Sequence, residues 1–117
     1  MIVFVYGSLK RGKNLHSFLK NARFLSEAYT KDKYPLILSR YGWYPYMSAK
    51  NSKGKLIKGE LYKIDYNTLK KLDRLEEVPF YYKRVKIRIK AKKTMVVWSY
   101  IYAKKKKFLK RELLSEF

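Results

Sequence analysis

The pattern of apolar and polar residues along the chain predicts a protein built mainly of short strands. Residues 82–90 alternate most regularly, with Val85, Ile87 and Ile89 on one side and basic residues between them, as in a strand with one buried face. A short turn leads into residues 94–102, which are rich in Val, Trp and Tyr, so these two segments are expected to pair as a hairpin. Further strands are expected at residues 1–5, 22–29, 34–38 and 56–64.

Two short helices and an aromatic loop interrupt the strands. Asn14 is a suitable cap for a first helix, and Asp65 for a second helix that Pro79 ends. Residues 40–54, which combine aromatic and turn-forming side chains, are expected to form a loop. Gly59 lies inside a strand pattern, which indicates a bulge or a close approach of another backbone. Many strands with two short helices predict an α+β fold with a mixed sheet or small barrel.

One carboxylate of the second helix falls on its apolar side. At about 100° per residue, the stripe of Leu69, Leu72 and Leu75 is centred near 300°, whereas Glu76 falls near 340° and Glu77 near 80°. A carboxylate that faces a core is costly unless it is hydrogen-bonded or has a chemical role. Desolvation also raises its pKa toward the range in which a general acid or base works. The structural alternative is a partly buried carboxylate bonded to Arg, Tyr or backbone near the helix end.

Composition limits the chemistry that this chain can perform. A length of 117 residues suits one domain, which is expected to span residues 1–103, followed by a basic, weakly helical tail over residues 104–117. Cysteine is absent, which excludes disulfides, thiol catalysis and Cys-based metal sites. His16 is the only histidine, and nothing supports a triad or metal site built around it. The apolar run 2–5 is too short to cross a membrane, so a cytoplasmic protein is expected.

The charge of the chain is strongly positive. It carries 29 Lys and Arg against 9 Asp and Glu, a formal net charge of +20, and such a field attracts polyanions. A solvated lysine-coated surface, as in thermophiles, is a slightly better interpretation than a dedicated nucleic-acid surface. For non-specific binding to nucleic acid, the footprint would combine the polar face of the hairpin with the tail. It would consist of Lys86, Arg88, Lys90 and residues 104–107.

The turn after the first strand is a second candidate for chemistry. A strand that stops at Gly7 and leads through a basic loop to a helix exposes backbone N–H groups. These groups, with Lys10, Arg11 and Lys13 nearby, are suited to holding a carboxylate or an oxyanion. The glycine pattern and the terminal Lys-Ser/Thr of a phosphate-binding loop are missing.

Five short motifs follow one another at a distinctive spacing. They are Tyr-Gly-Ser-Leu-Lys-Arg-Gly at 6–12, Tyr-Pro-Leu at 34–36, Gly-Glu-Leu-Tyr-x-Ile at 59–64, Leu-Asp-x-x-Glu at 72–76 and Pro-x-x-Tyr-x-Arg at 79–84. In this order, and with the Val-x-x-Tyr strand that follows, they closely resemble the γ-glutamylcyclotransferase-like family, especially its γ-glutamylamine cyclotransferase branch. The resemblance covers residues 1–102.

The resemblance implies a small mixed β-barrel flanked by short helices, with a cavity at one end. It also implies that a γ-glutamyl amine, or a γ-glutamyl amino acid, is converted to 5-oxoproline with release of the amine, without a metal or organic cofactor. By the same resemblance, Tyr6, Gly7, Ser8 and Leu9 bind the glutamyl part of this small-molecule substrate. Glu76 is then the general acid and base, which agrees with the helical-wheel argument. The oligomeric state is left open.

Other residues have weaker assignments. Tyr82 and Arg84 are candidates for lining the cavity or bracing Glu76, with structural packing as an equal alternative. The aromatic segment 43–46 is a candidate for the cavity rim, or for a plug at the barrel end. Ser8 is interpreted as a turn or substrate contact and not as a nucleophile, because no base is assigned to it. A catalytically idle relative that serves as an interaction domain is the remaining alternative, and the intact loop and Glu76 argue against it.

Overall fold

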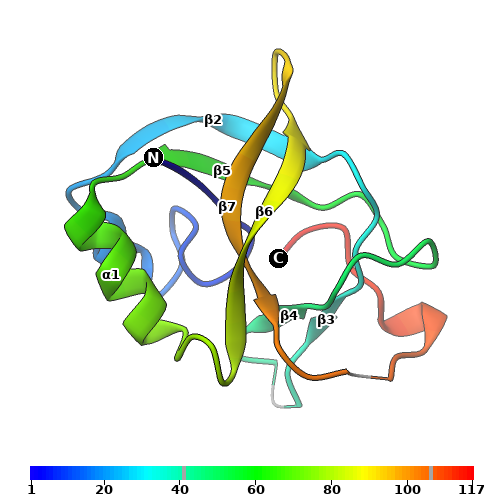
Figure 1. Cartoon of the computed structure of the whole chain (residues 1–117). Coiled ribbons are helices and arrows are strands. Elements are labelled where there is room, and N and C mark those ends of the chain that lie inside the picture. Colours follow the sequence, from blue (N-terminus) through cyan, green and yellow to red (C-terminus); the bar gives the residue numbers. More distant parts are fainter. Residues whose placement is uncertain (41, 106) are drawn as a thin grey trace.

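The protein is a closed five-stranded barrel with short elements packed around it (Figure 1). The computed structural model describes residues 1–40, 42–105 and 107–117. Strands neighbour one another in the order β1-β5-β2-β6-β7, and the barrel closes through a parallel contact between β7 and β1. The other pairs are antiparallel, so the expected small mixed barrel of an α+β fold is confirmed. The strands are β1 (Ile2–Val5), β2 (Arg23–Thr30), β5 (Lys58–Lys63), β6 (Tyr82–Lys90) and β7 (Thr94–Tyr102).

The expected hairpin is formed by β6 and β7. They pair along their whole length, from Tyr82 opposite Tyr102 to Lys90 opposite Thr94. Ile87 and Ile89 are buried inside the barrel, while the basic residues that alternate with them from Lys86 onward are exposed. The period of two along this segment therefore predicted both the pairing and the buried face.

A second, two-stranded sheet lies at one end of the barrel (Figure 1). It pairs β3 (Leu36–Leu38) with β4 (Pro45–Met47). β4 lies within residues 40–54, so the expectation of an uninterrupted loop there was wrong. β4 has only three residues, too few to show an alternating pattern. Its first residue, Pro45, is a type that favours the edge of a sheet or a turn. Tyr41, part of the same aromatic segment, lies outside the described residues.

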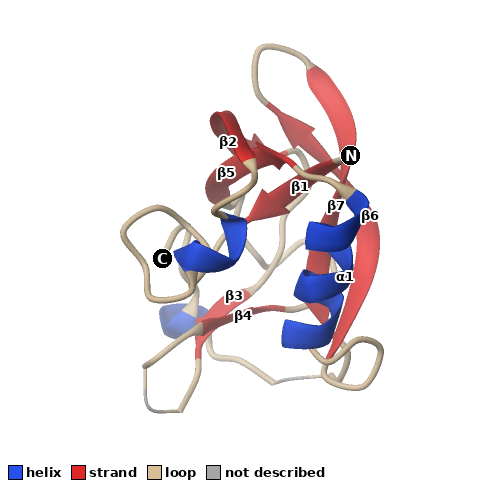
Figure 2. Cartoon of the chain, turned by 90° about the vertical axis from the view of Figure 1, so that its left-hand side faces the viewer, coloured by secondary structure: helices blue, strands red, loops and turns tan. Residues whose placement is uncertain are grey.

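Helix α1 (Tyr66–Leu75) covers the outer face of the barrel (Figure 2). Asp65 is its cap, as expected, because the Asp65 carboxylate accepts a hydrogen bond of 2.7 Å from the Thr68 N–H. Leu69 and Leu72 are buried against the barrel. The helix ends at Leu75, before Pro79, and Glu76 occupies its C-cap.

The segment after the first strand is a single turn of 3₁₀ helix, η1 (His16–Leu19). Its cap is Leu15, with no side-chain hydrogen bond, so the expectation that Asn14 caps a helix here was wrong. Asn14 is exposed on the preceding turn, in the run of tight backbone bonds that follows the basic loop. A helix this short gives a side-chain cap little to stabilise.

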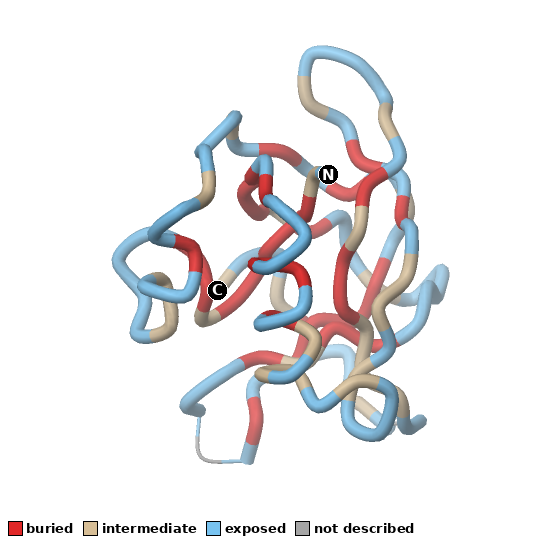
Figure 3. The backbone as a smooth tube through the Cα atoms, turned by 60° about the vertical axis from the view of Figure 1, so that its left-hand side comes forward, coloured by how far each residue is buried: buried red, intermediate tan, exposed pale blue. Residues whose placement is uncertain are grey.

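Buried side chains form two clusters on either side of the barrel wall. One fills the barrel and includes Phe4 and Leu61, and the other lies under α1 and η1 and includes Val3 and Leu72. Figure 3 marks the buried residues along the backbone. The expected close approach at Gly59 is confirmed, because a Cβ there would lie 2.4 Å from the Val5 carbonyl oxygen and 2.5 Å from the Phe4 ring. The barrel wall at this point therefore has room only for glycine.

The C-terminal segment packs back onto the barrel. After a 3₁₀ turn, η2 (Lys110–Glu112), the side chain of Leu113 is buried. The Leu114 N–H donates to the Leu36 carbonyl at 2.8 Å, and the Ser115 carbonyl accepts from the Lys58 N–H at 2.8 Å. Residue 106, within the basic run 104–107, lies outside the described residues. In the described part of the chain, no helix is long and apolar enough to cross a membrane.

Candidate active site

A cavity of about 430 Å³ opens at the end of the barrel next to the β3–β4 sheet. Its wall combines the turn after β1, the C-terminal end of α1, the β4 segment and the paired ends of β6 and β7. Segments far apart in the sequence therefore meet here, which is typical of a binding site. The wall consists of Phe4, Val5, Tyr6, Gly7, Ser8, Leu9, Leu15, Tyr44, Pro45, Tyr46, Leu75, Glu76, Glu77, Tyr81, Tyr82, Tyr100 and Tyr102.

The carboxylate of Glu76 lies in this wall, half-buried. Its place is fixed by the helix end, because the Glu76 N–H donates to the Leu72 carbonyl at 2.9 Å. Burial raises the pKa of Glu76 to about 7. Within the described part of the chain, no side chain or backbone group donates a hydrogen bond to this carboxylate, and no cation pairs with it. A carboxylate in this state can exchange a proton near neutral pH.

Two tyrosines face the Glu76 carboxylate. Burial raises the pKa of Tyr6, and the nearby Tyr82 and the negative charge of Glu76 raise it further. Burial also raises the pKa of Tyr82, with Glu76 as the next cause. The Tyr6 hydroxyl donates to the Tyr100 carbonyl at 2.7 Å, so its ring is held in place. Both phenols therefore stay protonated at neutral pH.

Glu77 borders the same cavity but is exposed. Its backbone has a φ of 51°, in the left-handed region that non-glycine residues rarely adopt. The Glu77 carbonyl accepts from the N–H groups of Phe80 and Tyr81. The chain turns sharply at this residue, and the two adjacent acids consequently have different environments.

The turn after β1 presents backbone N–H groups to the cavity. The Gly7 carbonyl accepts from the Lys10 N–H at 3.0 Å, which closes the turn. In the described residues, no protein group accepts a hydrogen bond from the N–H of Gly7, Ser8 or Leu9. A Cβ on Gly7 would come within 2.9 Å of the Pro45 ring, so the turn lies tightly against β4. Three free N–H groups at one edge of a cavity can bind a carboxylate or an oxyanion.

Tyr82 and Arg84 occupy different places. Tyr82 lines the cavity, whereas Arg84 lies outside its wall. The Arg84 Nε donates to both oxygens of Asp73, at 2.9 and 3.2 Å, and the Tyr100 hydroxyl donates to Asp73 at 2.7 Å. This cluster ties α1 to β6 and β7 one turn before Glu76.

Aromatic side chains form most of the remaining wall. Tyr46 and Tyr102 have ring centroids 4.6 Å apart, and Tyr82 lies 5.7 Å from Tyr102. Of the aromatic segment 43–46, the residues from Tyr44 onward line the cavity, while Trp43 is 75% exposed. No pattern in the sequence indicated that Tyr81, Tyr100 and Tyr102 share this wall, because their common location depends on the hairpin register and the turn after α1.

His16, which had no assigned role, contacts the turn. Its Nδ1 lies 2.9 Å from the carbonyl oxygen of Leu9, and a carbonyl only accepts, so Nδ1 carries the proton. His16 therefore holds the outer side of the turn. No sequence signal indicated this, since a lone histidine near a helix is most often a packing residue. Among the described residues, no group of three or more His, Cys, Asp or Glu could hold a metal ion.

Comparisons with known proteins agree with this geometry. Residues 3–116 match the family described as gamma-glutamyl cyclotransferase, AIG2-like. A Methanocaldococcus jannaschii protein, provisionally named a gamma-glutamylcyclotransferase, is 41% identical over 86% of this chain and 82% of its own length. Human gamma-glutamylaminecyclotransferase is 34% identical over 75% of this chain and 61% of its own length.

Solved structures show the same fold. The crystal structure of an AIG2-like protein from Mus musculus superposes with a TM-score of 0.82 and 27% identity, covering 87% of this chain and 76% of that one. An uncharacterized protein from Pyrococcus horikoshii superposes with a TM-score of 0.72 and 26% identity, covering 98% of this chain and 86% of that one. Sequence motifs, barrel topology and family match agree, and the chain belongs to the AIG2-like gamma-glutamyl cyclotransferase family of enzymes.

Proposed function

We propose that this enzyme converts a γ-glutamyl amine, or a γ-glutamyl amino acid, to 5-oxoproline and releases the amine, with Glu76 as general acid and base. The observation that carries the proposal is that one cavity contains both the Glu76 carboxylate and the N–H groups of the turn at residues 7–9. A half-buried carboxylate without a cation, with a pKa of about 7, shares this cavity with a turn whose N–H groups are free. The family and the names of the relatives support the reaction class.

The reaction begins on the α-amine of the substrate, which is protonated and inert at neutral pH. Glu76 accepts a proton from this ammonium group, and the freed nitrogen attacks the γ-carbonyl carbon to form a five-membered ring. The carbonyl π electrons move onto oxygen, and the oxyanion accepts hydrogen bonds from the turn at Gly7, Ser8 and Leu9. Orientation inside the cavity brings amine and carbonyl together, a second large contribution to the rate.

The tetrahedral intermediate then collapses. Its oxyanion re-forms the carbonyl, the bond from carbon to the departing nitrogen breaks, and Glu76 returns its proton to that nitrogen. Without this proton the amine would be a poor leaving group. The ring nitrogen still carries a second proton from the original ammonium group. This proton passes through the freed Glu76 carboxylate to the released amine, so the lactam keeps one N–H and the amine leaves as an ammonium ion. Proton transfer by a positioned side chain typically contributes ~10²–10⁴-fold to a rate. The pKa of Glu76 lies close to neutral, so the same carboxylate can perform both transfers.

The cavity wall divides the recognition of substrate into two parts. The turn at 7–9, with the Ser8 hydroxyl, is polar and is suited to the glutamyl half. The opposite wall is aromatic, through residues such as Tyr46 and Tyr102, and is suited to the methylene groups of an amine. Rings at this wall also exclude water, which strengthens the hydrogen bonds made inside.

The test is release of 5-oxoproline from a panel of γ-glutamyl amines and γ-glutamyl amino acids. Glu76→Gln keeps the size of the side chain and removes its ability to accept a proton, so kcat should fall by about 10²–10⁴-fold. Glu77→Gln is the matched control, because it changes the neighbouring acid at the rim and should retain kcat within a few-fold. Equal activity of wild type and Glu76→Gln would exclude Glu76 from proton transfer.

A further inference from the structure

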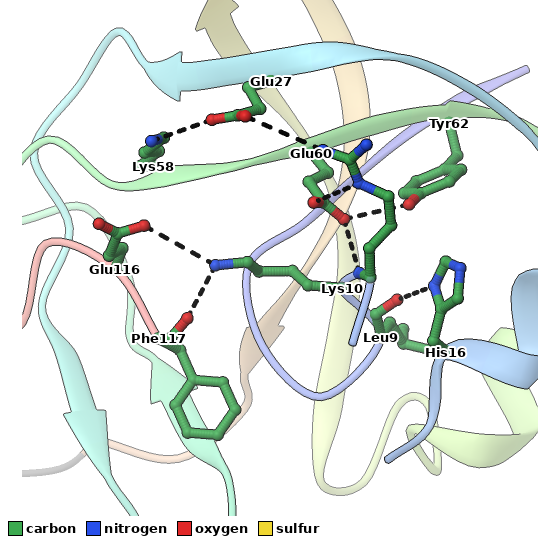
Figure 4. A network of polar contacts seen from close by, with 10 residues as sticks. Leu9, Lys10, His16, Glu27, Lys58, Glu60, Tyr62, Glu116 and Phe117 are labelled. Carbon is green, nitrogen blue, oxygen red and sulfur yellow. Dashed lines mark hydrogen bonds and ion pairs between the residues drawn. The ribbon is translucent and has the colours of Figure 1, made fainter. Parts of the chain in front are cut away.

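A second acid, Glu60, is buried behind the turn and has no part in the reaction described above. It lies on β5 opposite Val5, the last residue of β1, and it is 6% exposed. Figure 4 shows its carboxylate directed at the basic loop. One oxygen accepts the Arg11 N–H at 2.9 Å and the Tyr62 hydroxyl at 3.0 Å, and the other accepts the Arg11 Nε at 3.1 Å. Glu60 is not part of the cavity wall.

We propose that Glu60 and Arg11 are positioning residues that hold the turn at residues 7–9 in its binding shape. This inference rests on the proposed function of the turn. β1 fixes the turn at its start, and the bonds between Arg11 and Glu60 fix it at its end. The five residues between these two anchors therefore have little freedom to move away from the cavity.

The directions of the carbonyl groups explain why this matters. The carbonyl of Gly7 accepts from the Lys10 N–H, that of Ser8 from the Leu15 N–H at 2.9 Å, and that of Leu9 from His16. In a planar trans peptide, the N–H points opposite to the carbonyl of the preceding residue. The carbonyls of Gly7 and Ser8 point into the loop, where Lys10 and Leu15 bind them. The N–H groups of the same two peptides, which belong to Ser8 and Leu9, therefore point away from these loop partners.

The charge state of Glu60 suits a brace. Burial raises the pKa of Glu60, but the hydrogen bonds from the Arg11 backbone and side chain and from Tyr62 outweigh it, so the pKa lies below its ordinary value. The carboxylate is therefore ionised wherever Glu76 can act as a base, and charge-assisted hydrogen bonds are about twice as strong as neutral ones. Because the Arg11 side chain is half exposed, it can be replaced without opening the core.

The chain offers a matched control for this pair. The Arg11 guanidinium also lies 3.8 Å from Glu27, an exposed acid that pairs more closely with Lys58, at 2.9 Å (Figure 4). Glu27→Gln therefore removes one negative charge near Arg11 without touching the bonds to the loop. Glu27→Gln changes the net charge of this +20 protein by the same amount as Glu60→Gln, so a general effect of charge in that variant will appear in the control as well.

The experiment compares Arg11→Ala, Glu60→Gln and Glu27→Gln with wild type in 5-oxoproline release. Loss of the brace should raise KM and lower kcat together, with kcat/KM at least tenfold below that of Glu27→Gln. Arg11→Lys, which restores a cation, should recover part of the loss. In Arg11→Ala, the pKa of Glu60 rises, so kcat/KM should gain an extra dependence on pH at the acid end. A value of kcat/KM within twofold of the Glu27→Gln control in both variants would overturn the proposal.

A second measurement needs no substrate. In wild type the N–H groups of Lys10, Arg11 and Leu15 are hydrogen-bonded, so their hydrogen exchange, followed by NMR, should be slow. Arg11→Ala and Glu60→Gln should speed exchange at these amides and leave the helix α1 amides unchanged. If wild type turns over no substrate but exchange responds in this way, the proposed function fails and the brace holds. Unchanged exchange in both variants would overturn the brace itself.

Discussion

The raised pKa of Glu76 predicts that this carboxylic acid lowers the stability of the protein at neutral and alkaline pH. An acid whose pKa rises on folding binds protons more tightly in the folded state than in the unfolded chain. As pH rises from the ordinary pKa of 4.5 toward the folded value of about 7, the carboxylate ionises in the unfolded chain, whereas in the folded protein it would have to ionise in a poorly solvated place. The free energy of unfolding should therefore fall, and Glu76→Gln should remove this fall.

The size of the effect follows from the two pKa values. The ordinary value is 4.5 and the folded value is about 7, and each unit corresponds to about 1.4 kcal/mol. Below pH about 4.5 the carboxyl is protonated in both states, so wild type and Glu76→Gln should have the same pH dependence. Between about pH 4.5 and 7 the difference grows, and above pH 7 it levels off. Glu76→Gln should then be more stable than wild type by as much as about 3 kcal/mol.

Urea unfolding between pH 4 and 9, with wild type, Glu76→Gln and Glu77→Gln in parallel, measures this difference. Glu77 is exposed at the adjacent position, so its variant reports the removal of one negative charge without a change in burial. Self-repulsion among the many lysines affects all three proteins in a similar way and cancels in the comparison. A Glu76→Gln curve that runs parallel to wild type over this range would refute the argument that burial raises the Glu76 pKa.

Three further predictions concern the turn and the surface. Gly7→Ala would force a Cβ to 2.9 Å from the Pro45 ring; we expect a loss of about 1–3 kcal/mol in stability by urea unfolding, and an increase in KM. Ser8→Ala should keep kcat within about tenfold, because the role proposed for the hydroxyl is only to contact substrate; a loss as large as that of Glu76→Gln would indicate a nucleophile. Binding of a single-stranded oligonucleotide, followed by fluorescence anisotropy, should weaken steeply with salt. In a plot of log K against log[salt], each phosphate contact should contribute about −0.7 to the slope. Replacing the three exposed cations of the hairpin by Gln should make that slope less steep by about 2. Replacing the three lysines within residues 50–55 by Gln is the control and should change the slope less. Equal changes in the two variants would favour a uniformly solvated surface. The three hairpin cations are Lys86, Arg88 and Lys90.

The parts of the fold that could be predicted depend on local patterns. The β6–β7 hairpin was predicted because Val85, Ile87 and Ile89 repeat every second residue, and α1 because its leucines repeat at helical spacing. The same spacing predicted that Glu76 faces inward, and the structure places it half-buried in the cavity wall. The helical wheel still applies there because Glu76 is the C-cap, one residue beyond the last helical residue, Leu75. β4 gave no such pattern, because three residues are too few to establish a period.

The brace behind the turn could not be predicted from the sequence. Arg11 and Glu60 are 49 residues apart, and nothing in either segment indicates the other. Their meeting depends on the register of β1 and β5, which places Glu60 opposite Val5. The contact of His16 with Leu9 also depends on a chain path that local propensity does not determine. Side chains that shape a site from behind are thus harder to predict than the residues of the site itself.

The distribution of charge strengthens the assignment of Glu76. The chain has 29 Lys and Arg for 9 Asp and Glu, so pairing a carboxylate with a cation is easy, and most of the carboxylates here bind either a cation or a backbone N–H group. The partnered acids are Glu27, Asp32, Glu60, Asp65, Asp73, Glu112 and Glu116.

Glu76 is half-buried and has no partner among the described residues, whereas its neighbour Glu77 is exposed to water. Arg84 binds Asp73, one helical turn before Glu76, and is not part of the cavity wall. An arginine paired with the Glu76 carboxylate would lower its pKa and leave it too weak a base to take a proton from an ammonium group. The fold therefore pairs a cation with the acid one turn earlier and leaves Glu76 without one among the described residues, an arrangement that stability alone would not favour.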